Sequence, residues 1–389
     1  MRHLTAITAA LAAAIGLAGC SSMPSVNPLE WFDSTPKGPQ PATLPPLSNP
    51  QNARLLWHAS IGASEPFSFS PALAGGAIFV AARDGSVARI EADKGSIAWR
   101  VSAGARLSAG VGSDGAIVVV ATEEGEVIAL DAKSGSPRWR TRVSSEVLAA
   151  PKVAAGMVLV RSADSRIFAF DADDGKRRWV YQRAASALAI RSPAGMTVNE
   201  SMVYAGFSGG KLVAVMLANG AARWEATVAL PKGATELERV TDVGGEPAIQ
   251  GREVCAASYQ GRVACFDLMT GSLTWAREVS TLNGTSIDAR YAFVSDAAGT
   301  VQALDRSSGK SVWKQVRLSH RQLTVPVPVG GEVAVGDLQG YVHLLARESG
   351  AFLGRIATDG SAIAVAPLRL RVGFMVQTRA GNLYAFAPQ

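Results

Sequence analysis

Two of the three cysteines, Cys255 and Cys265, are placed so that their thiols could form a disulfide. They flank a predicted hairpin turn at residues 259–261. A two-residue loop at Gln260 and Gly261 would put the two side chains on opposite faces of the hairpin, whereas a three-residue loop would make them face each other. The sequence leaves both states open, and we favour two buried free thiols over a disulfide.

Other residue types that commonly do chemistry are dispersed along the chain. His58, His320 and His343 do not have the spacing of metal ligands. The sequence has no Gly-x-Ser-x-Gly elbow and no phosphate-binding loop. The acidic pair Asp173-Asp174 lies in a predicted turn, where a solvated loop is the ordinary role of such residues. The sequence therefore predicts no catalytic residue, no metal and no cofactor, and a protein that is not an enzyme.

The third cysteine, Cys20, has a different expected chemistry. It ends the run Leu17-Ala18-Gly19-Cys20, directly after an apolar stretch too short to span a membrane. This run resembles a bacterial lipobox, which implies cleavage of residues 1–19 as a signal peptide and a diacylglycerol on the sulfur of Cys20. The next residue is Ser21 and not Asp, which by the same resemblance implies export to the outer membrane.

Residues 20–50 are expected to form a tether behind the lipidated cysteine. Eight prolines fall between positions 21 and 50, and the segment has no apolar periodicity. Such a segment cannot build a core, so we expect it to be extended and mobile.

The remaining residues, 51–389, carry a repeat in which a tryptophan follows a turn glycine by 14 positions. The pairs are Gly85 and Trp99, Gly125 and Trp139, Gly210 and Trp224, Gly261 and Trp275, and Gly299 and Trp313. Ser165 and Trp179 keep the spacing without the glycine, and Gly340 and Gly354 keep it without the tryptophan. The turn at Gly381 would need a tryptophan beyond the last residue, and Trp57 at the other end is left over. A unit divided between the two termini predicts a closed ring.

Each repeat has the composition of a propeller blade. Strands of alternating residues surround each turn, and a third strand begins at the tryptophan. Four short antiparallel strands in a unit of roughly 40 residues are typical of β-propellers. Eight turns predict an all-β, eight-bladed β-propeller, closed by a strand at residues 55–58. The net charge of +6 is spread over the repeats without a basic run among aromatics, so nucleic acid is not an expected partner.

Two connections between repeats are longer than the others, at residues 181–192 and 229–243. Both should lead from an outer strand to the next inner strand, so they should emerge on the same face from adjacent blades. Insertions in a minimal scaffold commonly carry function. In the first, Leu188, Ile190 and Arg191 could anchor a protein partner, although Leu188 and Ile190 could instead begin the inner strand. In the second, residues 235–242 could form a short helix or a turn.

The phrase formed by Ala129, Asp131, Gly135 and Trp139 resembles the docking motif of quinoprotein-type eight-bladed propellers. The resemblance implies that each tryptophan packs between neighbouring blades and that the aspartate braces the turn. It also implies an alternative function, a dehydrogenase that binds pyrroloquinoline quinone and calcium over the central channel. The chain has neither the vicinal cysteine pair of many such enzymes nor their long insertions.

The lipobox, the proline-rich tether and the eight-bladed ring together resemble the BamB family of lipoproteins in the outer-membrane β-barrel assembly machinery. The resemblance implies a non-enzymatic scaffold on the periplasmic face of the outer membrane. Its expected partners are the periplasmic domains of a BamA-like factor, other lipoproteins of that machinery and unfolded outer-membrane proteins. Family contact segments match Leu188-Ala189-Ile190-Arg191 and Asp242-Val243-Gly244. The predicted partner-binding residues are therefore Leu188, Ile190, Arg191 and Asp242.

Overall fold

A computed structural model describes residues 39–47, 50, 53–184, 186 and 188–387, and every regular element in these ranges is a β-strand. The chain divides into two units at residue 40, and the second unit, Pro41–Gln389, contains all the strands. The predicted signal peptide and Cys20 lie outside the described residues. Within the described ranges, no helix has the length and apolarity needed to span a membrane.

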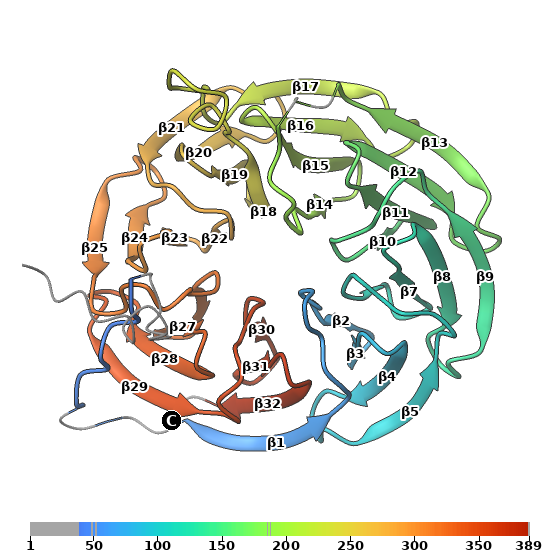
Figure 1. The fold of residues 1–389 in the computed structure, drawn as a ribbon, viewed down its shortest axis with the longest axis horizontal. Coiled ribbons are helices and arrows are strands. Elements are labelled where there is room, and N and C mark those ends of the chain that lie inside the picture. The colour runs from blue at the N-terminus through green and yellow to red at the C-terminus, as the bar shows by residue number, and fades with distance from the viewer. Residues whose placement is uncertain (1–38, 48–49, 51–52, 185, 187, 388–389) are drawn as a thin grey trace, which may run out of the picture. The chain divides into compact units, whose positions relative to one another are not determined.

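The second unit is a ring of eight four-stranded antiparallel sheets, which confirms the predicted eight-bladed propeller (Figure 1). Blades 1 to 8 are numbered along the chain, and the strands of each blade are named from the innermost to the outermost. Blade 1 contains β2 (Ala72–Ala74), β3 (Ala77–Ala81), β4 (Ser86–Glu91) and β5 (Ile97–Ser102). Blade 2 contains β6 (Gly112–Ser113), β7 (Ile117–Ala121), β8 (Glu126–Asp131) and β9 (Pro137–Arg142). Blades 3 and 4 are β10 (Lys152–Ala154), β11 (Met157–Ser162), β12 (Arg166–Asp171), β13 (Arg177–Gln182), and β14 (Met196–Val198), β15 (Met202–Phe207), β16 (Lys211–Met216), β17 (Ala222–Thr227).

The second half of the ring repeats this order. Blades 5 and 6 are β18 (Val243–Gln250), β19 (Glu253–Ser258), β20 (Arg262–Asp267), β21 (Leu273–Glu278), and β22 (Ser286–Ile287), β23 (Tyr291–Ser295), β24 (Val301–Asp305), β25 (Ser311–Gln315). Blades 7 and 8 are β26 (Val327–Val329), β27 (Glu332–Gly336), β28 (Tyr341–Ala346), β29 (Phe352–Ala357), and β30 (Leu368–Arg369), β31 (Phe374–Gln377), β32 (Asn382–Ala387), β1 (Arg54–Ser60).

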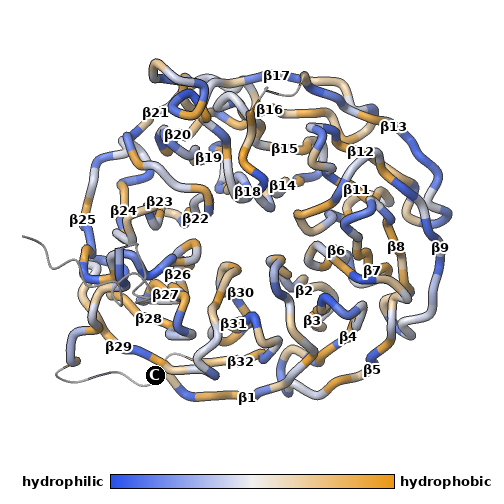
Figure 2. The backbone as a smooth tube through the Cα atoms, viewed as in Figure 1, coloured by the Kyte–Doolittle hydropathy of each residue, from blue (hydrophilic) through white to orange (hydrophobic). Residues whose placement is uncertain are grey.

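The core lies between the blades. The two middle strands of a blade have both faces covered by the adjacent blades, so they read as continuous apolar runs; all five residues of β7 are buried. The outermost strands alternate instead, and Figure 2 shows polar and apolar residues interleaved along the rim of the ring. Burial of the apolar side chains between the blades stabilises the fold, because each Å² of apolar surface removed from water contributes about 25 cal/mol.

Each predicted tryptophan links its own blade to the next. The indole lies on the glycine of the next blade's turn between its third and fourth strands, where a Cβ would be 2.4 Å from Trp275 at Gly309 and 2.5 Å from Trp57 at Gly95. The same indole donates its Nε1–H to a carbonyl of that turn, as in the 2.9 Å bond from Trp57 to Ala92. The indoles that do so are those of Trp57, Trp99, Trp139, Trp179, Trp224, Trp275 and Trp313.

The ring closes where the two ends of the chain meet. β1 pairs with β32 and completes blade 8, as predicted, with Arg54 opposite Ala387 and Ser60 opposite Asn382. Blade 8 therefore has no turn between its third and fourth strands, because these come from opposite termini. This explains Gly354, the one position of the repeat without a tryptophan: the next blade offers no turn glycine for an indole to cover.

The aspartate of the motif braces its turn, as the resemblance implied. Oδ1 of Asp131 accepts bonds from the backbone N–H groups of Ser134 (2.9 Å) and Lys133 (3.1 Å), and Oδ2 pairs with Arg138 at 2.7 Å. The Arg138 guanidinium, followed by the bonds from Ser134, holds the pKa of this carboxyl below its usual range.

The favoured prediction of two free thiols is wrong, because Cys255 and Cys265 form a disulfide. β19 ends at Ser258 and β20 begins at Arg262, so the hairpin has a three-residue loop. Gln260 takes a left-handed conformation in it, with φ of 45°. Cys255 and Cys265 are then directly opposite each other in the ladder.

Residues 41–47, which lie within the predicted tether of 20–50, belong to the propeller unit, and the N–H of Ala42 donates to the carbonyl of Ser319. Prolines do not prevent docking here, because the segment makes its contacts through the N–H and carbonyl of Ala42, the carbonyl of Pro45 and the side chain of Leu44, and it needs no ladder of its own.

Candidate protein-interaction site

The two long connections predicted from the sequence run from β13 to β14, residues 183–195, and from β17 to β18, residues 228–242. Each leads from the outermost strand of one blade to the innermost strand of the next. Because the strands of a blade are antiparallel, all such connections lie on one face of the ring, together with the turns between second and third strands. We call this side of the ring the connection face. The two connections occupy adjacent positions on it (Figure 1).

A hydrogen bond joins the two connections at their base. The N–H of Ile190 donates to Oδ2 of Asp242 over 2.6 Å. Only 5% of Asp242 is exposed, and its carboxylate makes this bond inside the protein. Burial raises the pKa of its carboxyl, and the bond from Ile190 and the charge of Arg161 act in the opposite direction. Arg161 itself donates to the carbonyl of Ala194 at 3.0 Å and so holds the end of the same connection.

Arg191 is fixed by a network of charges from three other loops. Its guanidinium binds Glu146 through Nε (3.0 Å) and Nη2 (2.7 Å), and Nη2 also reaches Glu123 at 3.2 Å. The bonds to Glu146 raise the pKa of the Arg191 guanidinium. Arg83 shares Glu123 at 3.2 Å, and both guanidiniums lie over the ring of Phe67, at 4.5 Å for Arg83 and 5.5 Å for Arg191. Arg191 therefore holds the connection against blades 1 to 3, and 53% of its side chain remains exposed.

Leu188 and Ile190 do not begin an inner strand, because β14 begins only at Met196. Leu188 is 48% exposed and Ile190 is half-buried above the bond to Asp242. Of the four predicted residues, the structure thus brings Ile190 and Asp242 into contact, leaves Leu188 open to solvent, and ties Arg191 to acidic residues of neighbouring loops.

Two exposed leucines in the second connection, Leu230 at 63% and Leu237 at 75% exposure, were not among the predicted residues. Leu237 could have been noticed in the sequence, since it lies between two glutamates in a charged insertion. Residues 235–242 form a turn and no helix. A capping box closes it: Glu238 accepts the N–H of Thr235 at 3.0 Å, and its own N–H donates to Oγ1 of Thr235 at 3.2 Å.

The described residues contain no group of three His, Cys, Asp or Glu side chains able to hold a metal ion. His343 is fully buried in blade 7 and pairs with Asp337 at 2.9 Å.

Fold and site together define a class of protein: a minimal eight-bladed β-propeller whose candidate site is built from connecting loops and carries exposed aliphatic side chains. A family model described as outer membrane protein assembly factor BamB matches residues 47–105 and 83–315. The chain belongs to this family of assembly factors, which confirms the resemblance seen in the sequence.

Individual relatives agree with this assignment. An outer membrane protein assembly factor BamB from Bordetella pertussis is 44% identical over 370 residues, which cover 95% of this chain and 93% of that protein. The crystal structure of BamB from Moraxella catarrhalis matches with a TM-score of 0.79 and 28% identity, over 86% of this chain and 100% of that one. A quinohemoprotein alcohol dehydrogenase from Comamonas testosteroni matches with a TM-score of 0.67 at 15% identity, over 86% of this chain and 76% of that one. The dehydrogenase shares the fold alone.

Proposed function

We propose that this protein is a non-enzymatic scaffold lipoprotein on the periplasmic face of the outer membrane. Cys20 carries the lipid, and the connection face binds the periplasmic domains of a BamA-like factor within the barrel assembly machinery. The ring holds that factor in position while client outer-membrane proteins fold and insert. The names of its relatives as assembly factors support this role.

The observation that carries the proposal is the construction of the two connections. Their bases are held by the Ile190–Asp242 bond and by the Arg191–Glu146 pair, and their outer parts carry the exposed Leu188 and Leu237. Preorganised loops with exposed aliphatic anchors suit protein binding, because little entropy is lost on docking and each buried leucine contributes about 1.5–3 kcal/mol. Within this proposal Leu188 is a contact, Ile190 supports it, and Arg191 and Asp242 position the loops.

The test compares two leucines of similar exposure. Leu188→Asp should weaken binding of the purified BamA-like periplasmic domains by at least about tenfold, the equivalent of about 1.4 kcal/mol. Leu273→Asp is the control, because Leu273 is 51% exposed at the start of β21, next to the turn between third and fourth strands and so on the face of the ring opposite the connection face. Both variants should keep the thermal unfolding midpoint, since both side chains already meet water. Equal affinities of the two variants would show that the site is elsewhere.

The dehydrogenase alternative has its own test. Purified protein is mixed with calcium and pyrroloquinoline quinone, dialysed, and measured for retained quinone absorbance. A stoichiometric retained signal would overturn the scaffold proposal.

A further inference from the structure

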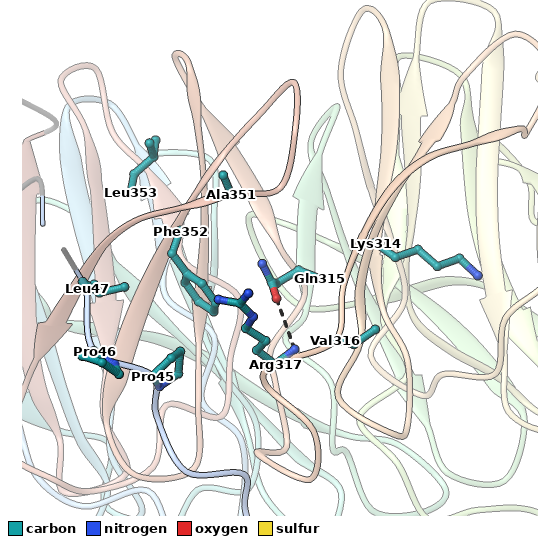
Figure 3. A pocket seen from close by; sticks show the side chains of 10 residues that line it. All are labelled: Pro45, Pro46, Leu47, Lys314, Gln315, Val316, Arg317, Ala351, Phe352 and Leu353. Atoms are coloured by element: carbon teal, nitrogen blue, oxygen red, sulfur yellow. Dashed lines mark hydrogen bonds between the residues drawn. The ribbon is translucent and has the colours of Figure 1, made fainter. Parts of the chain in front are cut away.

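The segment Pro41–Leu47, which we call the strap, is bound to blades 6 and 7, and its residues 45–47 form one wall of a groove there (Figure 3). The groove has a volume of about 540 Å³ and is lined by Pro45, Pro46, Leu47 and residues 314–317 and 351–353, from the outer strands β25 and β29 and their ends. Leu44 packs against the apolar cluster between these blades, which includes Trp313 and Leu323.

Polar contacts fix the backbone of the strap at three points. The N–H of Ala42 donates to the carbonyl of Ser319 at 2.9 Å. The carbonyl of Ala42 accepts a bond from Arg321 at 2.8 Å, and the carbonyl of Pro45 accepts one from Arg355 at 3.0 Å. The strap is therefore bound as a peptide ligand would be, through main-chain groups and one aliphatic anchor.

Arg321 is a buried donor that holds the strap. The residue is only 2% exposed, and each of its nitrogens has a partner: Nε bonds Asp337 (2.7 Å), Nη2 bonds Gln339 (2.6 Å), and Nη1 bonds the carbonyl of Ala42. The strap supplies the acceptor for Nη1.

The N-terminal end of the strap is bound on the connection face. Ser319 and Arg321 lie in the connection between β25 and β26, residues 316–326, which runs from an outermost to an innermost strand, as do the connections that carry Leu188 and Leu237. Ala42 is bound to this connection, so the chain that precedes the strap joins the ring at the connection face.

We propose that the junction of blades 6 and 7 is a receptor for the chain's own N-terminal segment. By seating the strap, it fixes the point at which the tether joins the ring, on the same face as the candidate partner site. With a lipid on Cys20, which rests on the proposed function, the 20 residues at positions 21–40 would span at most about 70 Å. When the strap is bound, tension from the lipid anchor is therefore applied to the ring at blades 6 and 7, on the connection face.

The experiment is amide hydrogen exchange on the full chain, resolved to the amides of Ala42 and Leu44. In the wild type the Ala42 amide should exchange at least tenfold more slowly than in an unstructured peptide of the same sequence. Leu44→Asp, which puts a charge in the half-buried anchor position, should return Ala42 to the unstructured rate. Thr43→Asp is the matched control, because the adjacent Thr43 is exposed, and it should preserve the protection.

Leu44→Ala serves as a second, milder variant and should reduce the protection without a buried charge. Unchanged exchange in blades 2 to 4 shows that the ring remains folded in each variant. An unprotected Ala42 in the wild type, or full protection in both Leu44 variants, would overturn the proposal. The measurement involves neither lipid nor partner, so its outcome is separate from that of the scaffold function.

Discussion

Replacing Asp242 tests whether the base of the candidate site is preorganised by one hydrogen bond. Asp242→Ala removes the acceptor of the 2.6 Å bond from the N–H of Ile190. A bond to a charged group contributes about 1.5–3 kcal/mol, and relief of the buried carboxylate, whose raised pKa reports a desolvation cost, offsets part of this. We expect a net loss of about 1–2 kcal/mol, which increases the open population of the connection by roughly 5- to 30-fold.

Hydrogen exchange of the Ile190 amide measures this opening directly, because exchange through local opening follows the open population. The expected acceleration is about 5- to 30-fold in Asp242→Ala. Asp242→Asn keeps an oxygen acceptor without the charge, so its exchange should remain within about threefold of the wild type. Equal acceleration in both variants, or none in Asp242→Ala, would refute the assignment of Asp242 as the brace of this connection.

The pH dependence of stability tests the burial of the Asp242 carboxyl independently. Burial raises its pKa in the folded state above that of the unfolded chain, so in the interval between the two values the folded state binds more protons. This group's contribution to stability therefore increases as the pH falls from above the raised value to below the ordinary one. Asp242→Asn should remove that component from the urea midpoint measured across the interval.

Three further substitutions have clear expected outcomes. Arg191→Glu places a third carboxylate beside Glu123 and Glu146, so the affinity for the partner should fall severalfold. The unfolding midpoint should shift little, because exposed ion pairs contribute about 0–1 kcal/mol each. A variant that unfolds instead would make Arg191 a structural residue. Gly309→Ala would place a Cβ 2.4 Å from Trp275 and should lower the free energy of unfolding in urea by at least about 3 kcal/mol. Gly330 has a similar φ but open space around it, so Gly330→Ala should lower it by only about 1 kcal/mol. Similar losses in the two variants would contradict the packing argument. Replacing Cys255 and Cys265 together by alanine should lower the free energy of unfolding by about 2–3 kcal/mol, the loop-entropy value for their short loop, and an unchanged stability would show that the disulfide contributes nothing.

The ring could be predicted from the sequence because its determinants are local and repeated. Each blade needs a glycine under an indole and a tryptophan at a fixed spacing, so the repeat leaves little freedom in how the blades are arranged. The absence of a tryptophan at Gly354 is explained once the strand order of blade 8 is known. The three-residue loop at Gln260 was harder to predict, since a single residue in a left-handed conformation decides which faces the two cysteines occupy.

The candidate site was located by the length of its connections, but its geometry depends on residues far apart in sequence. Asp242 bonds a residue 52 positions away, and Arg191 reaches acids 45 and 68 positions away. The bonds of the strap to Arg321 and Arg355 span 279 and 310 positions. No local pattern encodes such pairs, so the burial of Asp242 and its bond to Ile190 could not be predicted from the sequence.

The closure of blade 8 also determines how the protein responds to mechanical force. β1 is held in its sheet by β32 alone, and a pull on Arg54 would separate the two strands one residue pair at a time, beginning at Arg54 and Ala387. A pull from the N-terminal side meets the strap first, where its hydrogen bonds with Ser319, Arg321 and Arg355 share the tension between blades 6 and 7. The seam of the ring is thereby shielded from tension transmitted along the tether.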